Sequence, residues 1–126
     1  MNDKKKPAWV IEQLQEEEFL ARQVSLTPQD YKEAVHNLVL LANSDINSSI
    51  ATAQLLLSLY NGHNWHMDLT DLCLLDYKNL QYALIAIRGR VVLGIEPHQI
   101  IEDGPAKFEF LENKWQHLHT NQRYKK

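Results

Sequence analysis

The stretch GHNWHMDLTDLC, residues 62–73, gathers several side chains able to bind a metal. Two histidines stand three residues apart, two aspartates also stand three apart, and the only cysteine of the chain follows. Imidazole, carboxylate and thiolate groups are the ligands that zinc takes, in sets of three or four that converge on the ion. A metal-binding site in this segment would draw on His63, His66, Asp68, Asp71 and Cys73.

The spacing of these residues favours a structural role instead. Neither HNWH nor the lone cysteine matches a helical zinc motif. Trp65, Met67 and Leu69 alternate with polar residues, which is typical of an extended strip with one face against the protein. We therefore predict no metal and no cofactor. We predict a connector that buries Trp65 and Leu69 and leaves His63 and His66 exposed.

Catalytic patterns are missing from the sequence as well. No phosphate-binding glycine loop occurs, and no serine stands in the Gly-x-Ser-x-Gly frame of a nucleophile elbow. His117 and His119 stand two apart, and such residues point away from each other on a helix. We predict no catalytic residue and conclude that the protein is not an enzyme.

Hydrophobic periodicity predicts helices throughout, and the fold class is all-α. Five segments show helical spacing of apolar residues, and they are 7–23, 26–43, 44–62, 76–94 and 105–119. Short links between them predict a compact bundle of four to five helices. An ordered apolar connector joins the third helix to the fourth, and Asp76 is the expected N-cap of the latter.

Each segment carries an apolar stripe that we expect to face inward. The stripes are Val10, Leu14 and Ala21 in the first segment; Tyr31, Val35, Leu38 and Ala42 in the second; Ile46, Ile50, Ala53, Leu57 and Tyr60 in the third; Tyr77, Leu80, Leu84, Ile87 and Val91 in the fourth; and Phe108, Leu111, Trp115 and Leu118 in the fifth.

Polar and glycine signals predict where several helices begin and end. Thr27 and Pro28 mark the start of the second helix. The third has no lysine, arginine or glutamate up to Asn61, which predicts the most buried helix, and Gly62 is expected to end it in a left-handed conformation. Gly94 is the expected stop of the fourth helix, although Gly89 can end its regular part near Arg88.

Composition indicates one globular domain in a reducing cytoplasm. The chain has 126 residues, 44% of them hydrophobic, a net charge of -3 and a single cysteine, which cannot form an internal disulfide. No stretch is apolar enough to span a membrane, and none resembles a signal peptide. We divide the chain into an amphipathic N-terminal helix or arm (1–25), a helical core (26–119) and a flexible tail (120–126).

The segments LLLSLYNG, DLTDLCLLD and LIAI carry a resemblance to a known family. Over Leu26 to Leu118 the chain resembles an uncharacterised family of small bacterial helical domains, often encoded by phages, plasmids and integrated elements. The chain departs from that pattern at HNWHM, where Trp65 and Met67 replace the more usual phenylalanines. The resemblance implies an origin but no activity. It also implies that DLTDL, which contains Asp71, is a structural signature of the fold.

These observations favour a non-enzymatic protein-binding or accessory module, possibly regulatory, whose partner is another protein or a second copy. Trp9, Tyr82 and Tyr124 are large side chains that simple helical stripes leave exposed. A nucleic-acid-binding accessory protein is one alternative, but the third helix lacks the arginine or lysine that a recognition helix brings to phosphates. A metal-binding protein that uses residues 63–73 is the other alternative.

Overall fold

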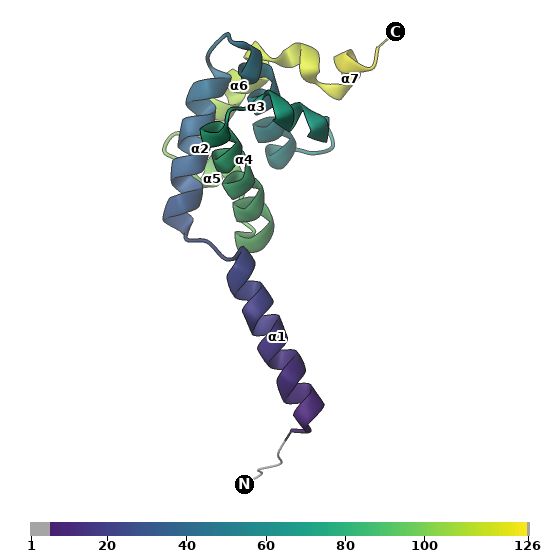
Figure 1. Ribbon diagram of the computed structural model, residues 1–126. Coiled ribbons are helices and arrows are strands. Elements are labelled where there is room, and N and C mark those ends of the chain that lie inside the picture. Colours follow the sequence, from purple (N-terminus) through teal and green to yellow (C-terminus); the bar gives the residue numbers. More distant parts are fainter. Residues whose placement is uncertain (1–5, 126) are drawn as a thin grey trace.

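The computed structural model describes residues 6–125, and every regular element in this range is helical (Figure 1). The all-α prediction is therefore confirmed for this part of the chain. The α-helices are α1 (Ala8–Val24), α2 (Pro28–Ala42), α3 (Asn47–Tyr60), α4 (Tyr77–Arg88), α5 (Pro97–Ile100), α6 (Gly104–Lys114) and α7 (Thr120–Arg123). Two 3-10 turns, η1 (Leu69–Leu74) and η3 (Gln116–Leu118), and one π turn, η2 (Gly89–Leu93), lie between them.

The start of α2 is fixed by a reciprocal cap, as predicted. Thr27 Oγ1 accepts a hydrogen bond from the Asp30 amide at 3.1 Å, and Asp30 Oδ2 accepts one from the Thr27 amide at 3.4 Å. This capping box satisfies two backbone donors that the first helical turn leaves open. The predicted inward stripe of α2 is confirmed, because all four of its residues are buried.

The prediction that the third helix is the most buried is confirmed for α3. Ser49 and every residue from Ala51 to Leu57 are buried, and α3 packs against α2. The predicted stop at Gly62 is wrong. The helix ends at Tyr60, and Asn61 follows with φ of -152° and ψ of 88°. Among the glycines of the described range, Gly94 is the one with a positive φ.

Small residues decide which side of α4 faces the core. Ala83, Ala86 and Gly89 are buried, and α4 packs closely on α2. The predicted inward stripe is wrong at three positions, because Tyr77, Leu84 and Val91 are exposed. Bulky side chains on the inner side would hold the two helix axes apart, whereas alanine and glycine allow a close approach.

The end of α4 agrees with the sequence prediction. The regular helix ends at Arg88, and Gly89 begins the π turn η2. Gly94 then ends the turn with φ of 70°, the left-handed conformation that glycine adopts without strain.

The second half of the chain contains shorter elements than the sequence predicted. The helix expected over 105–119 ends at Lys114, and Leu118 reaches the core from the 3-10 turn η3. Trp115 is half-buried at the junction, where its Nε1 donates a hydrogen bond to the Ala42 carbonyl at 3.0 Å. The helical turn α5 lies in the link between the fourth and fifth predicted helices. Pro97 at its first position and the Glu96–Gln99 cap stabilise it as a helix.

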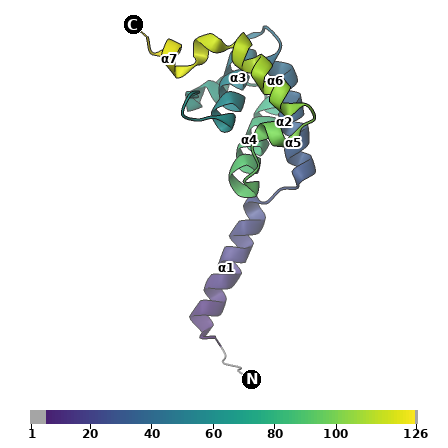
Figure 2. The same cartoon turned by 180° about the vertical axis from the view of Figure 1, so that it is seen from behind.

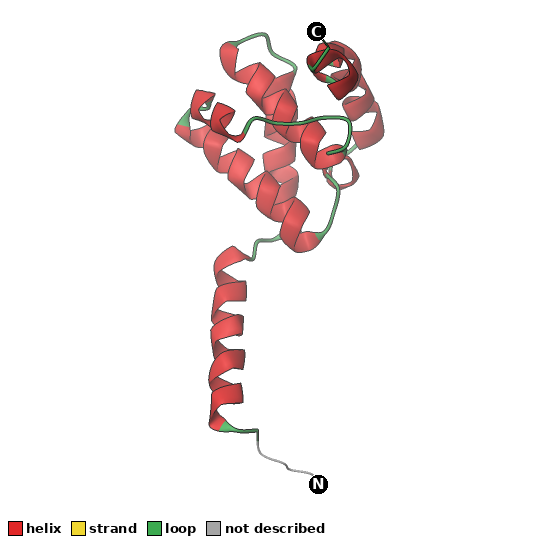
Figure 3. Ribbon diagram, turned by 90° about the vertical axis from the view of Figure 1, so that its right-hand side faces the viewer, coloured by secondary structure: helices red, strands yellow, loops and turns green. Residues whose placement is uncertain are grey.

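The helices α1 and α7 lie at opposite ends of the described part of the molecule (Figure 1). Figure 2 shows α1 extending away from the packed helices as a separate rod, and Figure 3 shows the same arrangement from the side. No side chain of Ala8–Val24 is buried by any residue of the described range. At the other end, part of the expected flexible tail forms the helical turn α7, which contacts the connector through Arg123.

Candidate functional site

The connector between α3 and α4 holds Trp65 at its centre, as predicted. Trp65 is only 3% exposed, and its backbone forms an isolated antiparallel bridge with His119. The two rings meet edge to face with centroids 5.0 Å apart, and the Thr120 amide donates to the Asn64 carbonyl at 2.9 Å. The connector therefore joins the middle of the chain to its C-terminal end.

The prediction that Leu69 is buried is wrong. Leu69 opens the 3-10 turn η1 and is 70% exposed. The alternation that gave the prediction stops at this residue, because the chain changes there from an extended strip to a turn with about three residues per turn. Leu72 and Leu75 pack against the core in its place.

The aspartates of the connector contact α3 and α4. The buried Gln54 of α3 donates from Nε2 to Asp71 Oδ2 at 3.3 Å and accepts from the Asp68 amide at 3.3 Å. Asp76 caps α4 by accepting from the Asn79 amide at 3.0 Å. Sequence reasoning did not find Gln54, since a polar residue on an otherwise apolar helix gives no sign of the partner it meets.

The five metal candidates of the connector do not converge on one point. His63, His66 and Cys73 are exposed. His66 Nδ1 lies 3.0 Å from the Tyr124 hydroxyl, its backbone carbonyl accepts from Arg123, and Arg123 pairs with Asp68 at 2.6 Å. Within residues 6–125, no three histidine, cysteine, aspartate or glutamate side chains lie close enough together to hold one ion.

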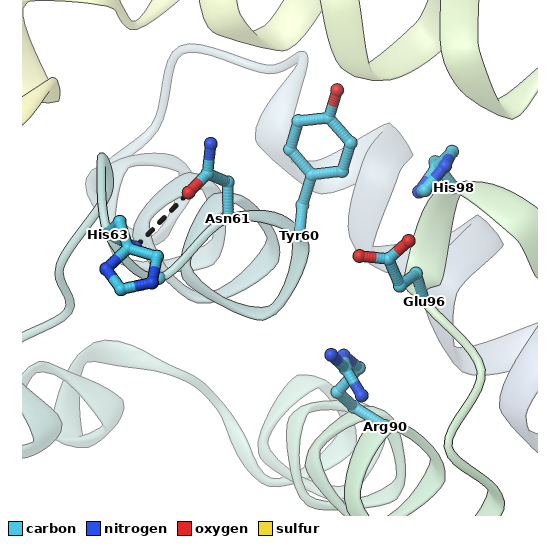
Figure 4. Close-up of a pocket in the computed structure, with 7 residues that line it drawn as sticks. Tyr60, Asn61, His63, Arg90, Glu96 and His98 are labelled. Atoms are coloured by element: carbon cyan, nitrogen blue, oxygen red, sulfur yellow. Dashed lines mark hydrogen bonds between the residues drawn. The ribbon is translucent and has the colours of Figure 1, made fainter.

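A polar hollow opens between the end of α3, the turn η2 and the start of α5 (Figure 4). It has a volume of about 790 Å³. Figure 4 shows the Arg90 guanidinium and the Glu96 carboxylate extending toward the open space from two neighbouring segments. The full lining consists of Tyr60, Asn61, Gly62, His63, Arg90, Glu96 and His98.

Local contacts hold the walls of this hollow in place. Arg90 Nε donates to the Leu59 carbonyl at 3.2 Å, and Arg90 forms no ion pair with any residue of the described range. The rings of Tyr60 and His98 meet edge to face at 5.0 Å. Burial, followed by the nearby charges of Glu112, Glu96 and Glu109, raises the pKa of Tyr60.

Chemically, the hollow offers hydrogen bonds and one charge of each sign. Among the described residues, neither a serine nor a cysteine lines it. Sequence reasoning missed the hollow because Arg90, Glu96 and His98 come from a helix end and a connection. No spacing pattern links them to the end of α3.

Two surfaces of the protein carry several exposed apolar side chains. We call one the α1 apolar face. Helical periodicity places the following residues on it: Trp9, Val10, Leu14, Leu20, Ala21 and Val24. We call the other the α4 stripe, and it consists of the exposed Tyr77, Leu84 and Val91, flanked by Leu80 and Ile87, which are half-buried against the core. Trp9 is 66% exposed, Tyr77 89% and Val91 74%. Contiguous exposed apolar side chains of this size commonly mark contact sites.

The helical core matches a known family. A family model described as a family of unknown function (DUF7673) matches residues 32–116. The match includes the connector, the hollow and the α4 stripe, and it does not extend to α1. No curated protein and no solved structure matches the chain.

Proposed function

The chain belongs to DUF7673, a family of unknown function, and we propose that it is a non-enzymatic protein-binding module that docks through α1. The observation that carries the proposal is the exposure of the α1 apolar face. Trp9, Leu14 and Leu20 are all exposed, although the helix has no apolar support from the described core. A protein partner would remove these side chains from water, which stabilises a complex in proportion to the apolar area buried.

The isolation of α1 supports the same proposal. A helix of 17 residues without packing partners is marginal in water. The ion pair between Glu18 and Arg22, 4.0 Å apart and exposed, adds only a few tenths of a kcal/mol. A docked partner would supply the tertiary packing from which most helices in proteins gain their stability.

Charge favours a protein over a nucleic acid as the partner. The exposed helix α1 carries four glutamates, Glu12, Glu16, Glu17 and Glu18, which repel phosphates. The helix α3, which would have to serve as a recognition helix, is largely buried and has no lysine or arginine. The partner of α1 is therefore a protein surface with apolar side chains and a basic rim.

The setting of this module is part of the proposal. From the resemblance to small bacterial domains of mobile elements, we propose an accessory or regulatory protein of a phage, plasmid or integrated element that acts in the cytoplasm. Among residues 6–125, no helix combines the length and the apolar character needed to cross a membrane.

Association of the full chain tests the proposal. The test variant carries Leu14→Asp and Leu20→Asp on the α1 apolar face, and the control carries Gln15→Asp and Gln23→Asp on the opposite side of the same helix. Both pairs add the same charge. Light scattering over a range of concentrations measures self-association, and affinity capture from the native host measures other partners.

We expect the wild type and the control to associate alike and the test variant to lose association. A wild type that stays monomeric and retains no partner would contradict the proposed function. Equal association by the test variant and the control would show that α1 does not carry it.

A further inference from the structure

We propose that the partner of α1 is a second copy of this chain, and that α1 of each copy docks on the α4 stripe of the other. This inference rests on the proposed function and names its partner. Two copies related by a twofold axis would make the same contact twice, as isologous dimers do. The α1 apolar face and the α4 stripe would then be covered by one arrangement.

The two surfaces are similar in length and character. The helix α1 has 17 residues and is about 25 Å long. The helix α4 and the turn η2 run continuously from Tyr77 to Leu93 and present apolar side chains of comparable extent. Leu84 and Val91 are 44% and 74% exposed, so a neighbouring helix can contact them without any change in the core.

The two surfaces carry opposite charges, which favours their binding to each other. The helix α1 carries four glutamates and one arginine. Between Tyr77 and Gly94 the chain has the exposed Lys78 and Arg88 and no acidic residue, while Arg90 is held in the wall of the hollow. Arg88 is exposed and stands four residues after Leu84 and three before Val91, so it borders the α4 stripe. Such a basic rim complements the glutamates of α1 and disfavours other orientations.

Contact between two copies of α1 is less favourable. On the α1 apolar face, Glu17 falls between Leu14 and Ala21 in the helical pattern. A parallel pair, or an antiparallel pair centred on this residue, would place two Glu17 carboxylates near each other. Like charges in a helix seam are destabilising. The α4 stripe offers Arg88 in place of a second glutamate.

The direction of α1 indicates a contact between molecules. Ser25 leaves the helix in an extended conformation, with φ of -71° and ψ of 155°. Figures 1 and 2 both show α1 directed away from its own α4. The α4 stripe of the same molecule therefore stays open to a second copy.

A mixing experiment with full-length variants tests this arrangement. The first variant, Leu14→Asp with Leu20→Asp, has a damaged α1 face and an intact α4 stripe. The second, Tyr77→Asp with Val91→Asp, has an intact α1 face and a damaged stripe, and both of its substitutions lie at exposed positions. Circular dichroism verifies the helical content of each. Light scattering measures the mass of each variant alone and of the equimolar mixture.

We expect the wild type to have twice the 14.7 kDa mass of one chain. Each variant alone should bind itself at least about 30-fold more weakly, as losses at the centre of an interface do. The mixture should regain dimers, because the intact α1 of the second variant fits the intact stripe of the first. These dimers should be weaker than those of the wild type, since they keep one contact of two.

If the wild type is dimeric but the mixture forms no dimers, α1 does not dock on the α4 stripe of a second copy. The inference is then overturned, and the proposed function still stands. A wild type that is monomeric at all concentrations would also overturn the inference. The capture experiment on the Leu14→Asp, Leu20→Asp variant and its control would then decide separately whether α1 binds another protein.

Discussion

The ring of Tyr31 in α2 lies directly against Gly89 at the start of η2, so close that a Cβ at Gly89 would overlap the ring. The Tyr31 hydroxyl continues past this contact and donates a hydrogen bond to the Ile95 carbonyl at 2.6 Å. One buried side chain thus fixes the distance between α2 and α4 and anchors the segment that leads into the hollow.

Gly89→Ala should destabilise the fold by about 1 to 3 kcal/mol, the usual range for overpacking. Helix propensity alone predicts the opposite, because alanine in a helix is about 1 kcal/mol more favourable than glycine. Urea denaturation of the variant and the wild type measures the difference. Gly94→Ala is the comparison, since its positive φ strains an alanine but nothing lies within 4 Å of the new Cβ. A Gly89→Ala protein as stable as the wild type would show that the contact is loose.

Tyr31→Phe should make stability depend less on alkaline pH. Burial chiefly raises the pKa of Tyr31 from 10.0 to about 12, while Arg90 lowers it and Glu96 raises it. Between these two values the unfolded phenol ionises and the folded one does not. The wild type therefore keeps the full contribution of Tyr31 below pH 10 and loses it as the pH rises toward 12, by about 1.4 kcal/mol per unit.

At pH 7 the Tyr31→Phe protein should be less stable by about 1 kcal/mol, because the Ile95 carbonyl loses its donor. This difference should shrink above pH 10 and vanish near pH 11. Denaturant melts at several pH values measure it. A difference that stays constant from neutral to strongly alkaline pH would contradict a raised pKa.

Trp65→Ala should cost about 3 to 5 kcal/mol, as large-to-small changes at buried aromatic sites do. His66→Ala should cost within about 0.5 kcal/mol, because the side chain and its contact with the Tyr124 hydroxyl are exposed and the contact with Arg123 uses the backbone carbonyl. Melts of both variants and of the wild type, with and without a chelator, provide the comparison. A chelator-sensitive wild type and a severe His66→Ala variant would support metal binding by the connector instead.

Gln54→Leu should destabilise the protein by about 1 to 3 kcal/mol, although leucine has a similar size. The substitution leaves the Asp68 amide without its acceptor and Asp71 without its donor. Hydrogen exchange at the Asp68 amide should accelerate, and α4 should remain protected. Unchanged exchange at Asp68 would mean that the amide has another acceptor, such as water.

Local signals predicted the starts of α2 and α4 and the buried side of α2, and in α3 they were wrong at Ile46, which is exposed. Thr27 and Asp76 cap helices because their side chains act on neighbouring amides, and such short-range effects are visible in sequence. The periodicity of α4 identified a helix but the wrong inner side, because two faces of that helix are apolar. Ala83 and Ala86 face α2, and only the packing of α4 against α2 reveals that choice.

The candidate sites depended on contacts that the sequence does not display. The hollow combines residues 60–63, at and just after the end of α3, with Arg90, Glu96 and His98, which come much later in the chain. The exposure of Leu69 follows from a change of backbone geometry inside one apolar segment. The α4 stripe was visible as a pattern, yet its position on the outside of the protein depends on the small residues between it and Tyr31.

Hydrogen exchange of the α1 backbone tests most directly whether α1 is a docking helix. In a monomer the amides of Ala8–Val24 should exchange nearly as fast as in an unfolded chain, because a lone helix of this length is marginal. Above the concentration at which dimers form, we expect their exchange to slow by about 100-fold or more, and the Leu14→Asp, Leu20→Asp variant should show no slowing. Fast exchange of α1 at every concentration, with α2 and α3 protected throughout, would contradict the account.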